Sequence, residues 1–246
     1  MCFPYDAIVP DLPPGFRAIA GGAAGERLTL TSQDGTAFSA YLADAEPAAA
    51  TGVVVLPDVR GLFGFYEQLA ERFAAAGYPA IAIDYFGRTA GLGPRDETFE
   101  YAPHVAQTTP ETVAQDVAAA LDALPAERAV TVGFCFGGAQ SFMDATFGHP
   151  KLVGAVGFYA SLQRDGQRWT LDRAPAITVP VLALFGGGDP HIPPDQVAAF
   201  ERALTVEHEV HTYPGAPHSF FDRRQEDYRA ESQDAWERIL GFIANR

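Results

Sequence analysis

The stretch Ala129-Val130-Thr131-Val132-Gly133-Phe134-Cys135-Phe136-Gly137-Gly138 decides the fold of this chain. Its first half is apolar and β-branched, which predicts a buried strand, and residues 139–144 after it favour a helix. Between them lies Gly-x-Cys-x-Gly, the pattern of a nucleophile elbow, a sharp strand-to-helix turn that exposes its central side chain. Glycines at these positions remove side chains that would collide in the strained turn. The pattern predicts a nucleophilic Cys135, and a small buried cysteine at a tight junction is the alternative.

Length and composition fit a globular protein that handles small molecules. The 246 residues carry a formal net charge of −14, with 48% hydrophobic and 20% charged residues. The negative charge disfavours nucleic acid and anionic membranes as partners, and no apolar run reaches the roughly 18 residues that span a bilayer. The first residues lack the pattern of a secretory signal, and Cys2 and Cys135 lack the spacing of metal ligands. We therefore expect a cytoplasmic protein without a structural disulfide.

Strands and helices are expected to alternate around the elbow. An irregular arm on the surface (1–25) comes first, and a long loop (85–108) interrupts the later pattern. Strands are predicted over 27–31, 37–42, 52–57, 79–84, 129–134, 153–159, 180–185 and 206–213, and helices over 66–76, 109–124, 139–144, 194–204 and 228–243. The pattern predicts an α/β fold over 1–246 as one domain, with an eight-stranded, mostly parallel sheet and helices on both faces.

Two further side chains follow predicted strands and complete a catalytic set with Cys135. A thiol nucleophile needs a base, and the base needs an acid that orients it. In open α/β sheets such groups sit at the carboxyl ends of strands. Asp189 follows the strand over 180–185, and His218 follows the last strand, so the order is that of α/β-hydrolases. The alternatives are a turn role for Asp189 and a base role for His191.

The remaining candidates are backbone amides and aromatic side chains. The amides of Phe136 and Val59 are the expected oxyanion donors. His208-Glu209-Val210-His211 looks like a metal motif, but on a strand its two histidines face opposite sides, so we expect no metal. Six aromatic residues form either a pocket or plain core: Phe63, Phe65, Tyr66, Phe134, Phe136 and Tyr159.

Five segments, taken together, resemble the dienelactone hydrolase family of α/β-hydrolases. They are Leu56-Pro57-Asp58-Val59-Arg60-Gly61, Ile83-Asp84-Tyr85-Phe86-Gly87-Arg88, Gly133-Phe134-Cys135-Phe136-Gly137-Gly138, Gly188-Asp189 and His218-Ser219-Phe220. The similarity runs from about Gly35 onward. It implies a hydrolase without a cofactor, of the carboxymethylenebutenolidase type known from aromatic compound degradation. In that reading Cys135 forms an acyl intermediate, His218 is the base and Asp189 orients it.

The resemblance also implies a set of substrate-binding and activating residues. This chain differs from the family's pattern at two of these positions. Arg88 would bind a substrate carboxylate through its guanidinium fork. The glutamate that helps to activate the family's nucleophile corresponds to Asp58, the candidate for that role here. The family's second carboxylate-binding arginine corresponds to Asp222, and Arg60 either supplies the missing charge or is a solvated surface arginine. The other expected substrate contacts are Tyr85, Phe63, Phe134 and Phe220.

The expected function is hydrolysis of a small-molecule ester or lactone by a monomer or small homo-oligomer. Two alternatives stay open. One is a thioesterase, another esterase or an acyl transferase that uses the same three residues. The other is a catalytically silent fold that binds a small ligand or senses redox state through Cys135.

Overall fold

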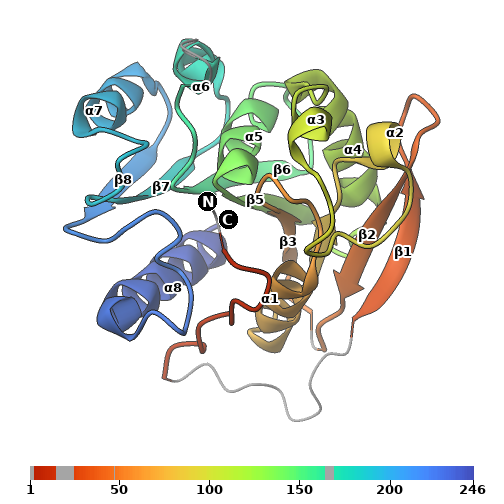
Figure 1. Ribbon diagram of the computed structural model, residues 1–246, viewed down its shortest axis with the longest axis horizontal. Helices are drawn as coiled ribbons and strands as arrows, with labels where there is room; N and C mark the ends of the chain where they lie inside the picture. Colours follow the sequence, from red (N-terminus) through yellow and green to blue (C-terminus); the bar gives the residue numbers. More distant parts are fainter. Residues whose placement is uncertain (1–2, 15–24, 47, 164–168) are drawn as a thin grey trace.

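Within the residues that the structure describes, 3–14, 25–46, 48–163 and 169–246, eight strands form one sheet in this computed structural model (Figure 1). They are β1 (Glu26–Thr31), β2 (Ala37–Ala43), β3 (Thr51–Leu56), β4 (Ala80–Ile83), β5 (Arg128–Phe134), β6 (Leu152–Phe158), β7 (Val181–Gly186) and β8 (His208–Tyr213). Their order in the sheet is β1-β2-β4-β3-β5-β6-β7-β8. The pairs β1–β2 and β2–β4 are antiparallel, and the pairs from β4 across to β8 are parallel. The predicted α/β sheet is confirmed.

The edge and the centre of the sheet differ in burial, as the sequence predicts. At one edge, β1 and β2 form the predicted hairpin, where Gly35 adopts a φ of 84° and donates its N–H to the Ser32 carbonyl at 2.9 Å. In the centre, every residue of β3 is buried, because helices cover this part of the sheet on both sides. Its continuous apolar sequence is typical of such a central parallel strand.

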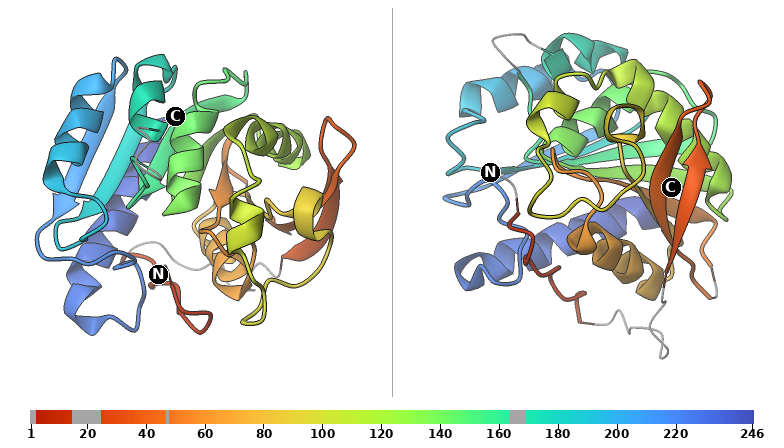
Figure 2. Two further views of the ribbon diagram at one scale, coloured as in Figure 1. Left: turned by 45° about the horizontal axis from the view of Figure 1, so that its top comes forward. Right: turned by 45° about the vertical axis from the view of Figure 1, so that its right-hand side comes forward.

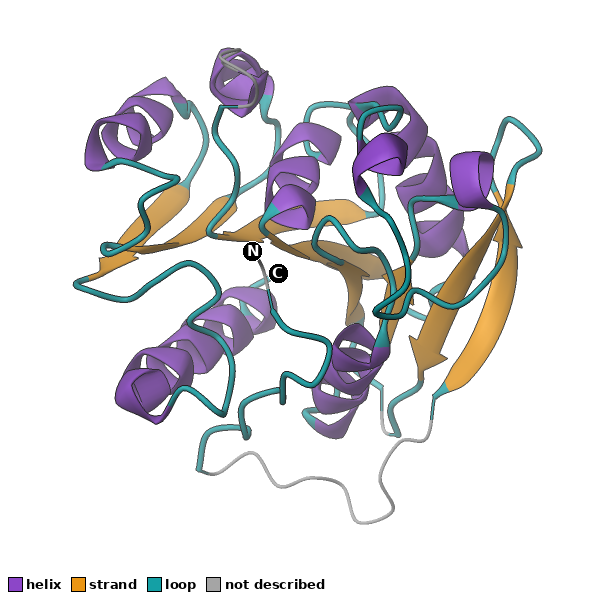
Figure 3. Cartoon of the chain, in the orientation of Figure 1, coloured by secondary structure: helices purple, strands orange, loops and turns teal. Residues whose placement is uncertain are grey.

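Helices cover both faces of the sheet (Figure 3). One face carries α1 (Gly64–Ala75) and α8 (Arg229–Ala244), and the other carries α4 (Pro110–Ala123), α5 (Phe136–Asp144) and α7 (Pro194–Ala203) (Figures 1 and 3). None of the helices in the described parts of the chain is long and apolar enough to cross a membrane.

Helix α4 begins where its sequence predicts. Thr109 Oγ1 accepts a hydrogen bond from the Thr112 N–H at 3.3 Å, and Thr112 Oγ1 accepts one from the Thr109 N–H at 3.2 Å. Pro110 occupies the first helical position, where its missing N–H is not needed. The capping residues therefore fix the end of the long loop that precedes the helix.

The prediction of one unbroken loop over 85–108 is wrong. It contains two four-residue helices, α2 (Gly87–Ala90) and α3 (Ala102–Val105). Between them, Arg95 Nη2 lies 2.7 Å from Asp84 Oδ2, and both side chains are buried. The buried ion pair fixes the loop to the carboxyl end of β4. Helices of one turn are too short to show a periodic apolar pattern, and the same applies to α6 (Trp169–Arg173).

The predicted surface arm is partly buried. Residues 1–2 and 15–24 lie outside the described residues, while residues 3–14 contain neither helix nor strand. This part of the chain runs between α1 and α8 (Figure 2). Phe3, Ala7 and Val9 are buried there, Phe3 completely. Their burial shows that the arm packs into the molecule, which its proline- and glycine-rich sequence did not indicate.

Candidate active site

Cys135 lies at the sharp turn between β5 and α5. Its backbone has φ 56° and ψ −111°, in the region that L side chains rarely adopt. A Cβ at Gly133 would collide with the backbone of Gly137, and one at Gly137 would collide with the backbone of Leu56. Both glycines are therefore required by close backbone contacts. The strand, the turn and the helix lie where the sequence predicts them, and the side chain of Cys135 is at the carboxyl end of a central strand.

His218 and Asp189 meet at this same edge of the sheet. His218 Nδ1 lies 2.6 Å from Asp189 Oδ2, and the side chain of Asp189 is fully buried. The second carboxylate oxygen, Oδ1, accepts the backbone N–H of His191 at 2.9 Å. Asp189 thus binds the ring of His218 and only the main chain of His191, which favours His218 over His191 as the base.

The protonation of His218 depends on both neighbours. Burial alone lowers the pKa of His218, but hydrogen bonds to Asp189 and Cys135, and the charges of those two groups, outweigh it and raise the pKa to about 9. For Asp189 burial acts to raise the pKa, while the hydrogen bond to His218 acts in the opposite direction and leaves the pKa below its ordinary value. The imidazole of His218 can therefore hold the proton that the Cys135 thiol gives up.

The surroundings of His218 contain two more residues with left-handed backbone. Tyr159, directly after β6, has a φ of 34°, and Ser219 has a φ of 63°. The ring centroid of Tyr159 lies 4.7 Å from that of His218, and Tyr159 is completely buried. The Ser219 carbonyl accepts the Gln225 side-chain amide at 2.6 Å. Non-glycine residues in this region cost about 1–3 kcal/mol each and concentrate at functional sites. The left-handed backbone of these two residues was not predicted from the sequence.

The predicted oxyanion donors follow two adjacent strands. Phe136 is the first residue of α5, after β5, and Val59 follows β3, which pairs with β5. The loop that carries Val59 is fixed at Asp58, whose N–H donates to the Tyr66 hydroxyl at 3.0 Å. The Asp58 carbonyl accepts the Gly61 N–H at 3.1 Å. The two residues predicted to donate these amides thus follow neighbouring strands at the carboxyl end of the sheet, where an oxyanion hole is expected.

Asp58 is completely buried and is paired with Arg60. Arg60 Nε lies 3.1 Å from Asp58 Oδ1 and Nη2 lies 2.6 Å from Oδ2. The guanidinium lies 4.8 Å from the ring centroid of Tyr5 and 4.6 Å from that of Phe63. The expectation of a solvated surface arginine is wrong, because Arg60 is only 9% exposed. Two aromatic rings and a carboxylate surround the guanidinium of Arg60 where water would surround an exposed one.

Arg88, the predicted carboxylate ligand, is engaged by other protein groups. Its Nη1 lies 2.8 and 2.7 Å from the two oxygens of Asp116, its Nε lies 2.6 Å from Asp34 Oδ2, and its Nη2 lies 2.8 Å from Ser32 Oγ. A substrate carboxylate at Arg88 would have to compete with these contacts. They connect α2 with α4 and with the β1–β2 hairpin.

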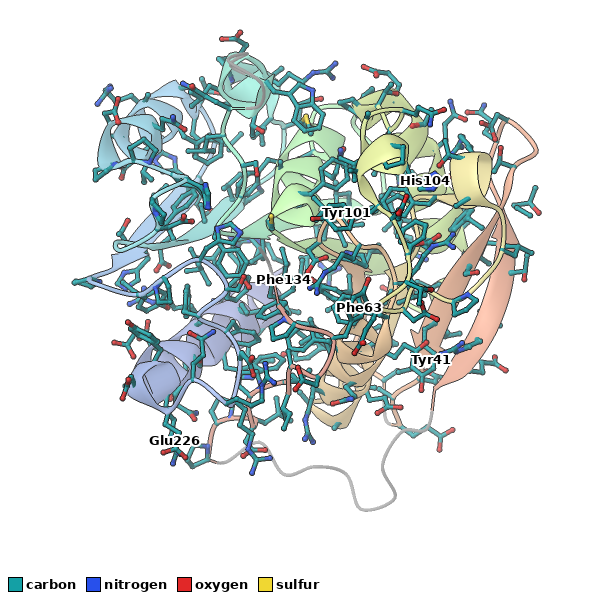
Figure 4. The ribbon with its side chains drawn as sticks, viewed as in Figure 1. Tyr41, Phe63, Tyr101, His104, Phe134 and Glu226 are labelled. Atoms are coloured by element: carbon teal, nitrogen blue, oxygen red, sulfur yellow. The ribbon has the colours of Figure 1, made fainter. Side chains whose placement is uncertain are left out.

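The predicted aromatic contacts divide between core and surface. Phe134 and Phe220 are completely buried and pack against other aromatic rings, and their contact with substrate stays a prediction. Tyr85 is buried too, and its hydroxyl donates to the Pro57 carbonyl at 2.8 Å. Phe63 lines a hollow of about 460 Å³ that Tyr5 and residues 95–98 also line. Figure 4 shows Phe63 and Phe134 near the middle of the molecule. Of these residues, Phe63 lines a space that a ligand can enter.

Burial raises the pKa of Tyr85 well above its ordinary range, and the neighbouring charges of Asp58, Asp84 and Cys135 act in the same direction. The phenol therefore stays neutral next to the thiol. Asp84 was not predicted as part of the site, although its place directly after β4 is the kind of signal that identified Asp189.

The parallel sheet, the elbow and the helices on both faces define an α/β-hydrolase fold. Within it, the family model for the dienelactone hydrolase family matches residues 38–246, and the chain belongs to that family. It is therefore an enzyme, a hydrolase.

Known relatives are similar to this chain over nearly its whole length. A Salmonella typhimurium protein named "Putative carboxymethylenebutenolidase" is 28% identical over 244 residues, covering 91% of this chain and 88% of its own length. A Saccharolobus solfataricus protein of the same name is 27% identical and covers 89% of this chain and 98% of its own length. The crystal structure of a "Putative Dienelactone Hydrolase" from Klebsiella pneumoniae superimposes on this chain with a TM-score of 0.75 at 27% identity. The match covers 90% of this chain and 100% of the Klebsiella chain.

Proposed function

We propose that this hydrolase cleaves small carboxylic esters and lactones, through an acyl intermediate on Cys135. The observation that carries the proposal is the hydrogen-bonded series from Asp189 to His218, at 2.6 Å, and from His218 to Cys135 at the elbow. This is the arrangement that a thiol nucleophile, its base and an orienting acid need. The family and the names of the relatives favour lactones and esters as the substrate class.

Acylation starts from the ion pair in which Cys135 has passed its proton to the nitrogen of His218 that does not bind Asp189. The thiolate attacks the carbonyl carbon, and the N–H groups of Phe136 and Val59 stabilise the negative charge on the oxygen. The carbon–oxygen bond of the ester then breaks, and the imidazolium of His218 donates its proton to the leaving oxygen. Asp189 keeps the ring in one orientation throughout, because its contact with Nδ1 is made in the resting enzyme.

Hydrolysis of the thioester completes the cycle. His218 accepts a proton from water, the hydroxide attacks the acyl carbon, and the carbon–sulfur bond breaks to release the acid and the thiolate. Because a thiolate leaves more readily than an alkoxide, the first tetrahedral intermediate tends to return to the ester. We therefore propose activated substrates, such as enol lactones and phenyl esters, whose leaving oxygen carries charge well.

The test is hydrolysis of dienelactone, p-nitrophenyl acetate and an acyl thioester by the wild type and by Cys135→Ala. We expect turnover of dienelactone or of the phenyl ester that the mutant loses. Turnover of the thioester alone would favour the thioesterase alternative. A Cys135→Ala variant as active as the wild type, or no turnover of any compound, would overturn the proposal and leave the ligand-binding alternative.

A further inference from the structure

The N-terminal segment 3–11 contacts two of the loops that carry predicted catalytic groups. It runs between α1 and α8 (Figures 1 and 2). One of these loops follows β3 and holds Val59, and the other follows β8 and holds His218. In the sheet, β5, β6 and β7 separate the two strands. A segment that touches both loops connects parts of the site that the sheet keeps apart.

At the β8 end, Asp222 holds the segment. This carboxylate is 2% exposed, and its Oδ1 accepts the Ile8 N–H at 3.1 Å. In return, the Arg223 N–H donates to the Ile8 carbonyl at 2.8 Å. Arg224 lies between two carboxylates, with Nη2 3.0 Å from Asp222 and Nη1 2.7 Å from Asp6. The loop that begins at His218 is thus joined to the segment by main-chain and charged contacts.

At the β3 end, Tyr5 contacts the loop that carries the predicted oxyanion donor. Its ring lies 4.9 Å from that of Phe63 and 4.8 Å from the guanidinium of Arg60. Arg60 in turn binds Asp58. Tyr5 therefore covers the ion pair between Asp58 and Arg60, the two residues that flank Val59 in the sequence.

Between these ends, Phe3 packs behind the catalytic residues. It is completely buried and stacks on Phe65 with ring centroids 4.2 Å apart. Its centroid lies 5.9 Å from that of Phe134, the neighbour of Cys135, and 6.1 Å from that of Tyr159, which contacts His218. A single side chain of the segment thus supports the residues next to both the nucleophile and the base.

We propose that segment 3–11 is a positioning clamp for catalysis, with Asp222, Phe3 and Tyr5 as its positioning residues. The clamp holds the His218 loop, through Asp222, at a fixed distance from the loop of Val59, through Tyr5. Phe3 fills the space behind Cys135 and His218. At position 222 this chain uses an aspartate to bind its own backbone, where the family resemblance had implied an arginine that binds substrate. The inference rests on the proposed function of Cys135 and His218.

The first experiment compares Asp222→Ala and Asp222→Asn with the wild type. An asparagine oxygen still accepts the Ile8 N–H, whereas alanine removes that contact. We expect kcat of Asp222→Ala to fall roughly 10- to 100-fold with KM within about twofold, because misplacement by about 1 Å costs rates of this size. The pH profile of Cys135 alkylation should move toward the ordinary thiol range in Asp222→Ala and less in Asp222→Asn. A merely structural role would lower Tm without moving this profile.

Glu226→Ala is the matched control, because it removes a carboxylate from the same loop. Its side chain is 79% exposed and pairs at 3.2 Å with Arg229, which lies outside segment 3–11. We expect kcat and the alkylation profile of this variant to match the wild type. If Asp222→Ala fails to fold, Phe3→Leu tests the middle of the clamp and should lower kcat in the same way.

The outcomes separate the clamp from the proposed function. Full activity and an unchanged alkylation profile in Asp222→Ala, or in Phe3→Leu where that variant replaces it, would overturn the clamp if Cys135→Ala is inactive. Activity of Cys135→Ala itself would overturn the proposed function, whatever the Asp222 variants do. Loss of kcat in Asp222→Ala with partial recovery in Asp222→Asn supports the clamp.

Discussion

At the scale of single residues, the proton between Cys135 and His218 is the property that matters most. A pKa of about 9 for His218, above the ordinary value of 6.5, means that the imidazolium persists until the pH rises through about 9. Over that range its charge favours a thiolate on Cys135. An isolated cysteine, by comparison, titrates near about 8.5.

We therefore predict that iodoacetamide alkylates Cys135 of the wild type almost as fast at pH 6 as at pH 8. In Asp189→Asn and His218→Ala, the rate should fall at least roughly tenfold at pH 6 and recover only as the pH approaches about 8.5. Peptide mapping by mass spectrometry distinguishes Cys135 from Cys2. A wild-type rate that rises only near the ordinary thiol pKa would contradict the thiolate–imidazolium pair.

Asp58 provides the second prediction at this scale. Its Oδ1 accepts the Arg60 N–H at 2.9 Å, a contact that shapes the turn at Val59 and that an asparagine can also make. If Asp58 acts by fixing this turn, Asp58→Asn should keep kcat within about fivefold of the wild type, and Asp58→Ala should lose about 100-fold. Steady-state assays well below the Tm of each variant measure this. Equal losses in both variants would instead favour the predicted role of Asp58 in activating Cys135.

The sequence indicates individual candidate catalytic residues only where topology constrains them. Asp189 and His218 were predicted because each follows a strand, and the carboxyl ends of parallel strands lie on one side of the sheet. The partners of Arg88 could not be found this way, because Asp116 and Asp34 lie 28 and 54 positions away and nothing in the sequence pairs them. The aromatic cover on Arg60 comes partly from Tyr5, in a segment whose sequence predicts only an irregular arm.

At the scale of elements, patterns that extend over several turns or residues were predicted well. The eight strands, the elbow and the start of α4 at Thr109 follow from apolar periodicity and capping residues. The short helices α2, α3 and α6 were missed, because four or five residues make little more than one turn and do not repeat an apolar pattern. Their positions depend on tertiary contacts such as the buried pair of Arg95 and Asp84.

Arg88 provides a test of how such contacts hold elements together. Arg88→Gln leaves Asp116, whose side chain is 1% exposed, without its counter-charge. Removing one partner of a buried pair is expected to lower the free energy of unfolding by about 3 kcal/mol. Arg173→Gln is the control, because its partner Glu111 is 54% exposed, and exposed pairs contribute less than about 1 kcal/mol. Urea denaturation measures both variants.

The same Arg88 variant distinguishes a structural role from substrate binding. With a structural role, KM for a carboxylate-bearing lactone should stay within about twofold of the wild type. A rise in KM of tenfold or more for that lactone alone, or about 1.4 kcal/mol of lost binding, would show that Arg88 binds the carboxylate as the resemblance implied.

At the scale of the whole molecule, the charge distribution bears on substrate choice. The chain carries a formal net charge of −14, and several arginines at or near the carboxyl edge of the sheet are bound to aspartates of the chain itself. These pairs are Arg60 with Asp58, Arg88 with Asp116, Arg95 with Asp84 and Arg224 with Asp222. Each pair is neutral overall, so the long-range field of the protein remains negative and repels anions.

An anionic substrate should therefore bind more readily as salt screens this field. The Debye length falls from about 30 Å at 0.01 M salt to about 8 Å at 0.15 M, so repulsion that extends well beyond the surface disappears over this range. We predict that kcat/KM for a carboxylate-bearing lactone rises roughly threefold across it, while kcat/KM for neutral p-nitrophenyl acetate stays constant. Stopped-flow or steady-state rates at fixed pH measure both. A fall in kcat/KM for the lactone with salt would mean that local cations attract it against the net charge, and would identify the lactone's carboxylate as a group that the site recognises.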